Sequence, residues 1–306
     1  MFADKLLERM MVFYGTQFPV QKGSWRLIER YRRSGRLSGC HSPGQFTRVK
    51  RGGFEFDLDL TDCVDQYLYL AGAYEKQDHD ELIRAIPPGG VFVDVGAHIG
   101  IYTLAMARAA GPSGCVHSFE PNPATFERLR HHVLQNGLAN VRLNQLAVGS
   151  TEGGAKLNAP TKENSGAASL LSTNMPARFE ARPVEVQVTS LDAYCRKHSV
   201  DRLDVIKIDC QGYELQVLEG GSNVLQRFRP RLLLEYDVDF LLASGASGTR
   251  LCSMLETRGY KAFKMHRGCL VPFAAEDKPG TVVNVHAIPA DRNSISDKSV
   301  GPLTHF

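Results

Sequence analysis

Several common signals of function are missing from this sequence. Its seven cysteines form an odd, scattered set without a Cys-x-x-Cys pair: Cys40, Cys63, Cys115, Cys195, Cys210, Cys252 and Cys269. Such a set signals neither a zinc site nor a disulfide framework and is typical of a reducing compartment, so we expect a cytoplasmic protein. No segment approaches the ~18–20 uncharged apolar residues that span a bilayer. Charged residues near the start also interrupt any apolar core of a signal peptide, so we expect no membrane partner.

A strong charge imbalance is missing too. The 36 basic and 33 acidic residues leave a net charge of +3, which is too mild to indicate a nucleic-acid partner. A hydrophobic content of 43% over 306 residues is enough to bury a sizeable core. The length therefore suits one large α/β domain with additions, or two small domains.

From Val91 onward, apolar segments typical of buried strands alternate with helical segments. The predicted strands cover residues 91–95, 115–120, 141–148, 204–209 and 231–236. The predicted helices lie near 101–110, 123–136, 190–198 and 213–219. Alternating strands and helices form a parallel sheet with right-handed crossovers. Two further strand-like segments, 260–265 and 281–288, predict a closing hairpin.

The remaining segments suggest a division of the chain into parts. Residues 1–85 are expected to form an N-terminal extension of helices and small strands that caps a substrate or makes an oligomer contact. Residues 86–290 form the main domain, and the polar tail at 291–306 is expected to be flexible. Within the main domain, glycines and prolines make 149–183 a loop-rich insertion on the side of the sheet where ligands bind.

The turn after the first predicted strand carries the strongest signal for a cofactor. It reads Asp94-x-Gly96-x-x-x-Gly100, and His98 stands where a dinucleotide fingerprint needs its second glycine. This argues against NAD or FAD. An acidic residue before the first glycine suits a cofactor with a cationic, amino-acid-like end, as in S-adenosylmethionine, and the loop amides can take a carboxylate. Glu120 ends the next strand, where a carboxylate can accept hydrogen bonds from both ribose hydroxyls.

A second group of carboxylates follows the later strands. Asp209 ends one buried strand, Glu214 lies five residues on, and Glu235 ends the next strand. Asp209 and Glu214 are candidates for the base that removes a proton from a hydroxyl acceptor, with His98 and His266 behind them. The alternative is structural, because these carboxylates could pair with Lys207 or cap helices. They could also hold a divalent metal, but no tight carboxylate motif supports that, so no metal ligands are assigned.

Three blocks of this sequence resemble the FkbM-type family of S-adenosylmethionine-dependent methyltransferases. They are Val93-Asp94-Val95-Gly96-Ala97-His98-Ile99-Gly100, Phe119-Glu120-Pro121, and Ile206-Lys207-Ile208-Asp209-Cys210-Gln211-Gly212-Tyr213-Glu214. The resemblance covers roughly residues 60–290. It implies an α/β, Rossmann-like class I methyltransferase fold with a mostly parallel seven-stranded sheet whose last strand is antiparallel. His98 departs from the asparagine that is usual in the family.

The resemblance also implies roles for individual residues. The cofactor loop would be lined by Asp94, Gly96, Ala97, His98 and Gly100. The ribose would be held by Glu120, with Pro121 and Asn122 beside the adenosine and an adenine contact near Leu146 and Ala147. The methyl end of the cofactor would be flanked by Asp209 and Glu214.

The sequence therefore predicts a methyltransferase that uses S-adenosylmethionine, yields S-adenosylhomocysteine and methylates a hydroxyl of a sugar or secondary metabolite. The expected partner is a small hydroxylated molecule, and a homodimer stays open as an option. A nicotinamide-dependent oxidoreductase is one alternative, opposed by the missing glycine. A nucleic-acid methyltransferase is another, opposed by Asp209-Cys210-Gln211-Gly212 where an N/D-P-P-aromatic tetrad would stand. A third is a non-catalytic module that keeps the fold.

Overall fold

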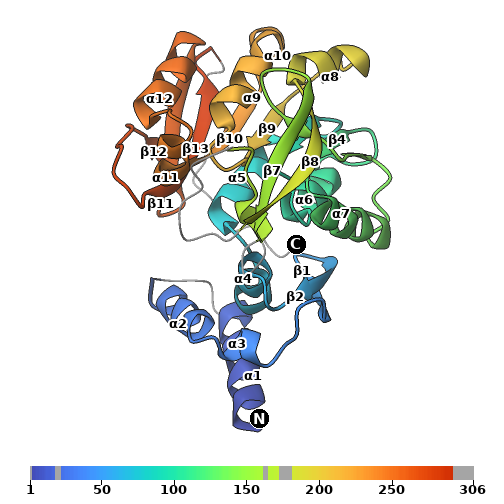
Figure 1. Ribbon diagram of the computed structural model, residues 1–306, viewed down its shortest axis with the longest axis vertical. Helices are drawn as coiled ribbons and strands as arrows, with labels where there is room; N and C mark the ends of the chain where they lie inside the picture. The colour runs from blue at the N-terminus through green and yellow to red at the C-terminus, as the bar shows by residue number, and fades with distance from the viewer. Residues whose placement is uncertain (1, 18–21, 161–164, 172–180, 292–306) are drawn as a thin grey trace. The chain divides into compact units, whose positions relative to one another are not determined.

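The computed structural model describes residues 2–17, 22–160, 165–171 and 181–291, which fall into two compact units (Figure 1). The smaller unit runs to Lys76 and includes Pro160–Gly166, and the larger unit comprises Gln77–Ala159 and the chain from Ala167. The boundary therefore falls earlier than the predicted residue 85. The reason is that the helix α5 (Lys76–Ala85) buries Leu82 in the core of the larger unit.

The smaller unit combines short helices with one hairpin. Its elements are α1 (Phe2–Gln17), α2 (Lys22–Arg33), α3 (Arg36–Gly39), β1 (Phe46–Arg51), β2 (Phe54–Asp59) and α4 (Cys63–Ala71). Arg51 and Phe54 pair across a two-glycine turn whose residues both have positive φ, as tight hairpins require. Asp62 caps α4 by accepting hydrogen bonds from the backbone N–H groups of Val64 and Asp65.

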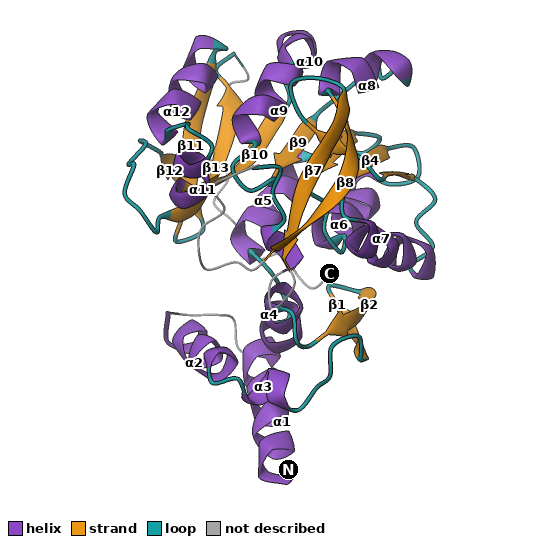
Figure 2. Ribbon diagram, viewed as in Figure 1, coloured by secondary structure: helices purple, strands orange, loops and turns teal. Residues whose placement is uncertain are grey.

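The larger unit is built on an eight-stranded sheet in the order β12-β11-β13-β10-β9-β3-β4-β5 (Figure 2). Its strands are β3 (Val91–Val95), β4 (Cys115–Phe119), β5 (Val141–Asn144), β9 (Val205–Ile208), β10 (Arg231–Asp237), β11 (Tyr260–His266), β12 (Cys269–Pro272) and β13 (Val282–Pro289). The first five are parallel, and β13 runs antiparallel between β10 and β11. This topology confirms the predicted class I fold, with β12 added at the edge as an eighth strand.

Helices cover both faces of this sheet, which explains why its central parallel strands, such as β3 and β9, are mainly apolar. The helices are α5, α6 (Ile101–Ala110), α7 (Pro123–Gln135), α8 (Leu191–Lys197), α9 (Glu214–Gly220), α10 (Ser222–Phe228), α11 (Val238–Ala243) and α12 (Gly248–Thr257). On one face, Phe92 and Val205 pack with residues of α5 and α6. On the other face, their neighbours Val93 and Ile206 pack with residues of α8 to α10.

The predicted strand at 141–148 is wrong as a single element, because the chain leaves the main sheet after Asn144. The next strand, β6 (Ala147–Val148), belongs to a three-stranded sheet with β8 (Ala181–Thr189) and β7 (Gly153–Pro160). The insertion at 149–183 is thus less loop-rich than predicted, since it holds β7, a short 3-10 helix at Ser165–Ala167 and the start of β8. Residues 161–164 and 172–180, and the predicted tail from residue 292, lie outside the described residues.

Candidate functional site

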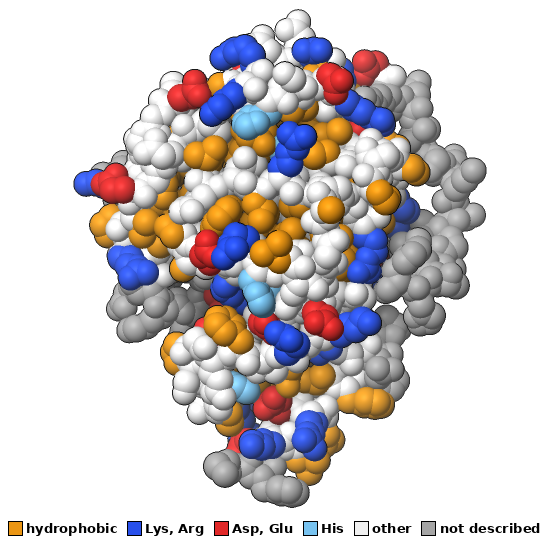
Figure 3. Space-filling view, turned by 90° about the vertical axis from the view of Figure 1, so that its right-hand side faces the viewer, with side chains coloured by type: hydrophobic (Ala, Val, Ile, Leu, Met, Phe, Trp, Pro, Cys, Tyr) orange, Lys and Arg blue, Asp and Glu red, His pale blue; other side chains and the backbone are white. Residues whose placement is uncertain are grey.

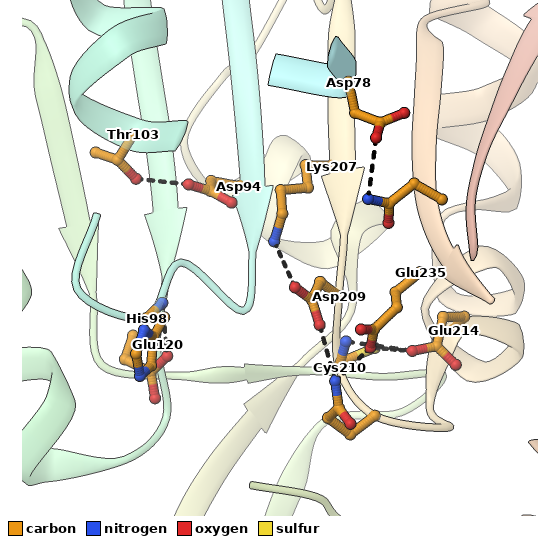
Figure 4. Close-up of polar contacts among 12 residues, drawn as sticks. Asp78, Asp94, His98, Thr103, Glu120, Lys207, Asp209, Cys210, Glu214 and Glu235 are labelled. Carbon is orange, nitrogen blue, oxygen red and sulfur yellow. Dashed lines mark hydrogen bonds and ion pairs between the residues drawn. The ribbon is translucent and has the colours of Figure 1, made fainter. Parts of the chain in front are cut away.

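Several of the predicted site residues, among them Glu120, Asp209 and Glu214, lie at the carboxyl-terminal edge of the parallel strands (Figure 4). Val95, Ile208 and Leu234 are aligned across β3, β9 and β10. The residues that follow these three in the chain are Gly96, Asp209 and Glu235. They therefore lie side by side in one row. This is the edge at which open α/β sheets bind ligands.

The turn from β3 to α6 depends on its two glycines. Gly96 has a φ of 76°, and a Cβ there would lie 1.8 Å from the backbone oxygen of Asp209. Its N–H and that of Ala97 donate to the backbone oxygen of Phe119 at 3.0 and 2.9 Å. Gly100 has a φ of 95°, and a Cβ there would meet side chains at 2.7 and 2.8 Å. Glycine is therefore required at these two positions by the backbone conformation and by the close packing around them.

Glu120 is placed against this turn. Its Oε2 accepts the backbone N–H of His98 at 3.0 Å and its Oε1 accepts that of Asn122 at 2.9 Å. Burial raises the pKa of Glu120 to about 7, although these two hydrogen bonds oppose the rise. Each carboxylate oxygen has a further lone pair, so the group can still accept a hydroxyl. Figure 4 shows the His98 side chain beside Glu120.

Three further residues were predicted to lie near the adenosine of the cofactor: Pro121, Asn122 and Ala147. The side-chain oxygen of Asn122 accepts the backbone N–H of Ala124 at 3.2 Å, so it caps α7, a role that the sequence analysis did not assign to it. Pro121 is half-buried beside it. Ala147 is 4% exposed and packs with Leu157 and Val186 in the three-stranded sheet. An adenine contact by Asn122 or Ala147 stays a prediction.

Asp94 is fully buried in β3 and held by a small polar network. Its Oδ2 accepts the hydroxyl of Thr103 at 2.7 Å, and that hydroxyl lies 2.7 Å from the hydroxyl of Ser118. Its Oδ1 has no hydrogen-bond partner among the described residues. Burial raises the pKa of Asp94, and the positive charge of Lys207 opposes this rise. An unsatisfied buried carboxylate oxygen fits a cationic ligand group, the end of the cofactor predicted for this residue.

Asp209 lies in the most strongly charged part of the site. Its Oδ2 contacts the ammonium of Lys207 at 2.9 Å, and Lys207 is 5% exposed. Its Oδ1 accepts the side-chain amide of Gln211 at 3.1 Å. Burial would raise the pKa of Asp209, but the charge and hydrogen bond of Lys207 hold it below its usual value. The side chain is 24% exposed, so an ionised carboxylate is available at the edge of the sheet.

Glu214 has turned inward and holds the loop that follows β9. Its Oε1 accepts the backbone N–H groups of Cys210 and Gly212, both at 3.2 Å, and the residue is 1% exposed. Burial raises the pKa of Glu214 to about 7. This arrangement favours the structural alternative over the predicted role as base. His266, the other predicted candidate, is exposed at the end of β11, with β13 and β10 between that strand and β9.

Sequence reasoning missed several polar residues on the same face of the sheet. They are Thr103, Ser118, Gln211, and the pair Asp78 and His286, whose Oδ1 and Nε2 atoms lie 2.7 Å apart. Four of them follow no local motif, and Gln211 lies in the third block of the resemblance without an assigned role. They come from α5, α6, β4, β13 and the loop after β9, so only the folded chain brings them together. Within the described ranges, no group of three or more His, Cys, Asp or Glu side chains is arranged to hold a metal ion.

Comparison with known proteins identifies the family. Residues 94–262, which include this whole row of polar groups, match the family described as the Methyltransferase FkbM domain. The chain belongs to the FkbM methyltransferase family. It is therefore an enzyme of the S-adenosylmethionine-dependent methyltransferase type, as the resemblance implied.

Named relatives of this FkbM-family chain are methyltransferases of several kinds. Methyltransferase 1 of Beauveria bassiana is 27% identical over 187 residues, 53% of this chain and 74% of that protein. The 31-O-demethyl-FK506 methyltransferase FkbM of Streptomyces tacrolimicus is 27% identical over 179 residues, 50% of this chain and 67% of that protein. The 2-O-methyltransferase NoeI of Sinorhizobium fredii is 26% identical over 163 residues, 49% and 65% of the two chains. Among the described helices, none is both long and apolar enough to cross a membrane.

Proposed function

We propose that this enzyme transfers a methyl group from S-adenosylmethionine to a hydroxyl of a small molecule such as a sugar or secondary metabolite. The observation that carries the proposal is the row at the sheet edge, where Asp209 is held ionised beside the glycine turn. Two of the named relatives have O-methylation in their names, which supports a hydroxyl as the acceptor.

The residues that would hold the cofactor fit its parts. Glu120 would accept the ribose hydroxyls, and the unsatisfied oxygen of Asp94 would face the cationic end. The backbone N–H groups of Gly96, Ala97, His98 and Gly100 already donate within the protein, so the predicted role of the turn amides in holding the carboxylate is not part of this proposal. When bound, the cofactor supplies an electrophilic methyl group on a sulfonium. The enzyme's own contribution is alignment of the two reactants and removal of the hydroxyl proton.

Asp209 is the proposed base. Its side chain is partly exposed and its ion pair with Lys207 favours the ionised form, so it can accept a proton at neutral pH. Glu214, at 1% exposure, lacks that access. A positioned base contributes roughly 10²–10⁴-fold to the rate.

A small acceptor is favoured over a nucleic acid by the charge distribution. The face in Figure 3 mixes acidic and basic side chains, without the single-sign stripe that phosphate backbones need. The net charge of +3 agrees.

Calorimetry with S-adenosylhomocysteine tests the proposal directly. The wild type should bind it, and Glu120→Ala should weaken binding by about 1–3 kcal/mol, because charge-assisted hydrogen bonds are lost. Glu127→Ala, which removes an exposed carboxylate on α7, is the matched control and should bind normally. A screen of hydroxylated compounds that follows S-adenosylhomocysteine formation then identifies the acceptor. Binding of NAD in place of S-adenosylhomocysteine would refute the proposal.

A further inference from the structure

Glu235 is the nearest acidic neighbour of Asp209 in the row at the sheet edge, and one side chain ties the two together. The Nε2 atom of Gln211 donates to Asp209 Oδ1 at 3.1 Å and also to Glu235 Oε2. A side-chain amide has two N–H groups, so one can serve each carboxyl group. Both oxygens lie within hydrogen-bond distance of the same nitrogen, so one amide group bridges the two carboxyl groups (Figure 4).

The local charges make it unfavourable for the carboxyl groups of Asp209 and Glu235 to be ionised at the same time. Lys207 is the cation in hydrogen-bond contact with Asp209, and it also faces the fully buried Asp94 across β3 and β9. Carboxylates that share a site in this way keep a proton between them. The other titratable groups facing the pair from neighbouring elements are Glu120, Cys210, Glu214 and, through Asn284 opposite Glu235, Asp78. Behind them, His286 contacts Asp78. The three groups other than Asp78 are acids, so they add to the penalty for a second charge.

We propose that Asp209 and Glu235 share one proton, that Glu235 carries it, and that Glu235 and Gln211 are positioning residues which keep Asp209 ionised as the base. The inference rests on the proposed function and deepens it. The contact of Lys207 with Asp209 decides which partner is ionised. A hydrogen bond with Glu235 is also among the causes that lower the pKa of Asp209.

The step balances without any further reactant. As the acceptor oxygen bonds to the methyl carbon, the carbon–sulfur bond breaks and its electron pair goes to sulfur. The hydroxyl proton moves to Asp209, which becomes neutral. The pair then holds two protons, and one leaves to water before the next turnover.

Infrared spectroscopy of the purified full chain tests where the proton lies, without any need for the acceptor. At about pH 8.5, Glu120 and Glu214 are mostly ionised because their pKa values are about 7. Carbon-13 labelling of glutamate carboxyls separates a protonated Glu from Asp94. We expect one labelled carboxylic-acid band in the wild type, its loss in Glu235→Gln, and its retention in Glu256→Gln, an exposed control on α12. An unlabelled band only, or a labelled band that persists in Glu235→Gln, would overturn the proposal.

The same samples are titrated with S-adenosylhomocysteine, so the two proposals can fail separately. Absent binding refutes the proposed function, whereas normal binding with no labelled acid band refutes only the shared proton.

Kinetics with a hydroxyl compound from the screen give a second readout. Glutamine can accept from Gln211 through its oxygen and donate to Asp209 through its nitrogen, as a protonated Glu235 does. Glu235→Ala should therefore lower kcat by about 100-fold with little change in KM, while Glu235→Gln loses less than about tenfold. In the wild type, we expect the plot of kcat against pH to show an inflection at alkaline pH, where Glu235 loses its proton. This inflection should be absent in Glu235→Gln. Equal losses in both variants, or none in either, contradict the proposal.

Discussion

At the scale of single residues, burial and one lysine divide the carboxylates of the site into two kinds. Burial raises the pKa values of Glu120 and Glu214 to about 7. Asp209 stays below its usual pKa because Lys207 contacts it at 2.9 Å. The carboxyl groups are chemically alike, so their different pKa values follow from their burial and from the position of the Lys207 ammonium group.

Glu120 should make cofactor affinity depend on pH. Only the ionised carboxylate accepts two ribose hydroxyls well, and its pKa is about 7. We expect S-adenosylhomocysteine affinity to rise with pH through about 7 and to fall on the acidic side by up to about tenfold per pH unit. Calorimetry between about pH 5.5 and 8.5 measures this. The variant Glu120→Gln should bind weakly and with little pH dependence, and an unchanged slope in that variant would exclude Glu120 as the titrating group.

Glu214 should make stability depend on pH in the opposite sense. Its pKa is raised in the folded state from 4.5 to about 7, so its contribution is complete below pH 4.5 and is lost as pH rises through about 7. Relative to the wild type, Glu214→Gln should gain roughly 2–3 kcal/mol in unfolding free energy between pH 4.5 and about 8. Urea titrations at several pH values test this, with Glu256→Gln as control. A constant difference between Glu214→Gln and the wild type would show that Glu214 is ionised at no cost.

At the scale of elements, the turn between β3 and α6 permits a comparison of two glycines. Both Gly96 and Gly137 have positive φ, at 76° and 65°. A Cβ at Gly96 would lie 1.8 Å from a backbone oxygen, whereas nothing lies within 4 Å at Gly137. Gly137→Ala should cost only backbone strain, about 1–2 kcal/mol. Gly96→Ala should cost more and should abolish S-adenosylhomocysteine binding, because β3 and β9 must move apart. Equal costs in denaturant titrations would show that the clash is relieved locally.

The strands that position the site were predictable from the sequence because they are buried on both faces. The predicted 91–95 and 115–120 correspond to Val91–Val95 and Cys115–Phe119 in the structure. The segment 141–148 was wrong because Ala147 and Val148 pair with β8 and not with the main sheet. Local pattern indicates that a segment is buried, but not which sheet it joins.

The sequence predicted where the site lies on the sheet, but it did not predict which way the side chains of the site point. Asp209 and Glu214 both follow β9, yet Gln211 takes a φ of 51° between them and the chain folds Glu214 back onto the amides of Cys210 and Gly212. Gln211 lies in the third block of the resemblance, but the sequence assigned it no role. Its role depends on Glu235, which is 24 residues away and reaches it only through sheet pairing.

At the scale of the whole molecule, contacts between distant parts of the sequence decide where the larger unit begins. α5 precedes the first strand of the sheet, and the sequence assigned it to the N-terminal extension. In the structure, Asp78 contacts His286 of β13 at 2.7 Å, across 208 residues of sequence, and Glu81 contacts Arg231 of β10 at 3.0 Å. His286 is 3% exposed, so this contact is shielded from water. These links make α5 part of the sheet's cover.

Breaking the Asp78 contact should therefore weaken the larger unit selectively. Asp78→Asn keeps the shape but removes the charge that His286 meets, at an expected cost of about 1–3 kcal/mol for a buried hydrogen bond. Hydrogen exchange followed by mass spectrometry should show faster exchange in peptides from α5, β10 and β13, with peptides from β1 and β2 unchanged. Asp201→Asn, at an exposed position before β9, is the matched control. If exchange increased in β1 and β2 instead, α5 would be coupled to the extension, as the sequence suggested.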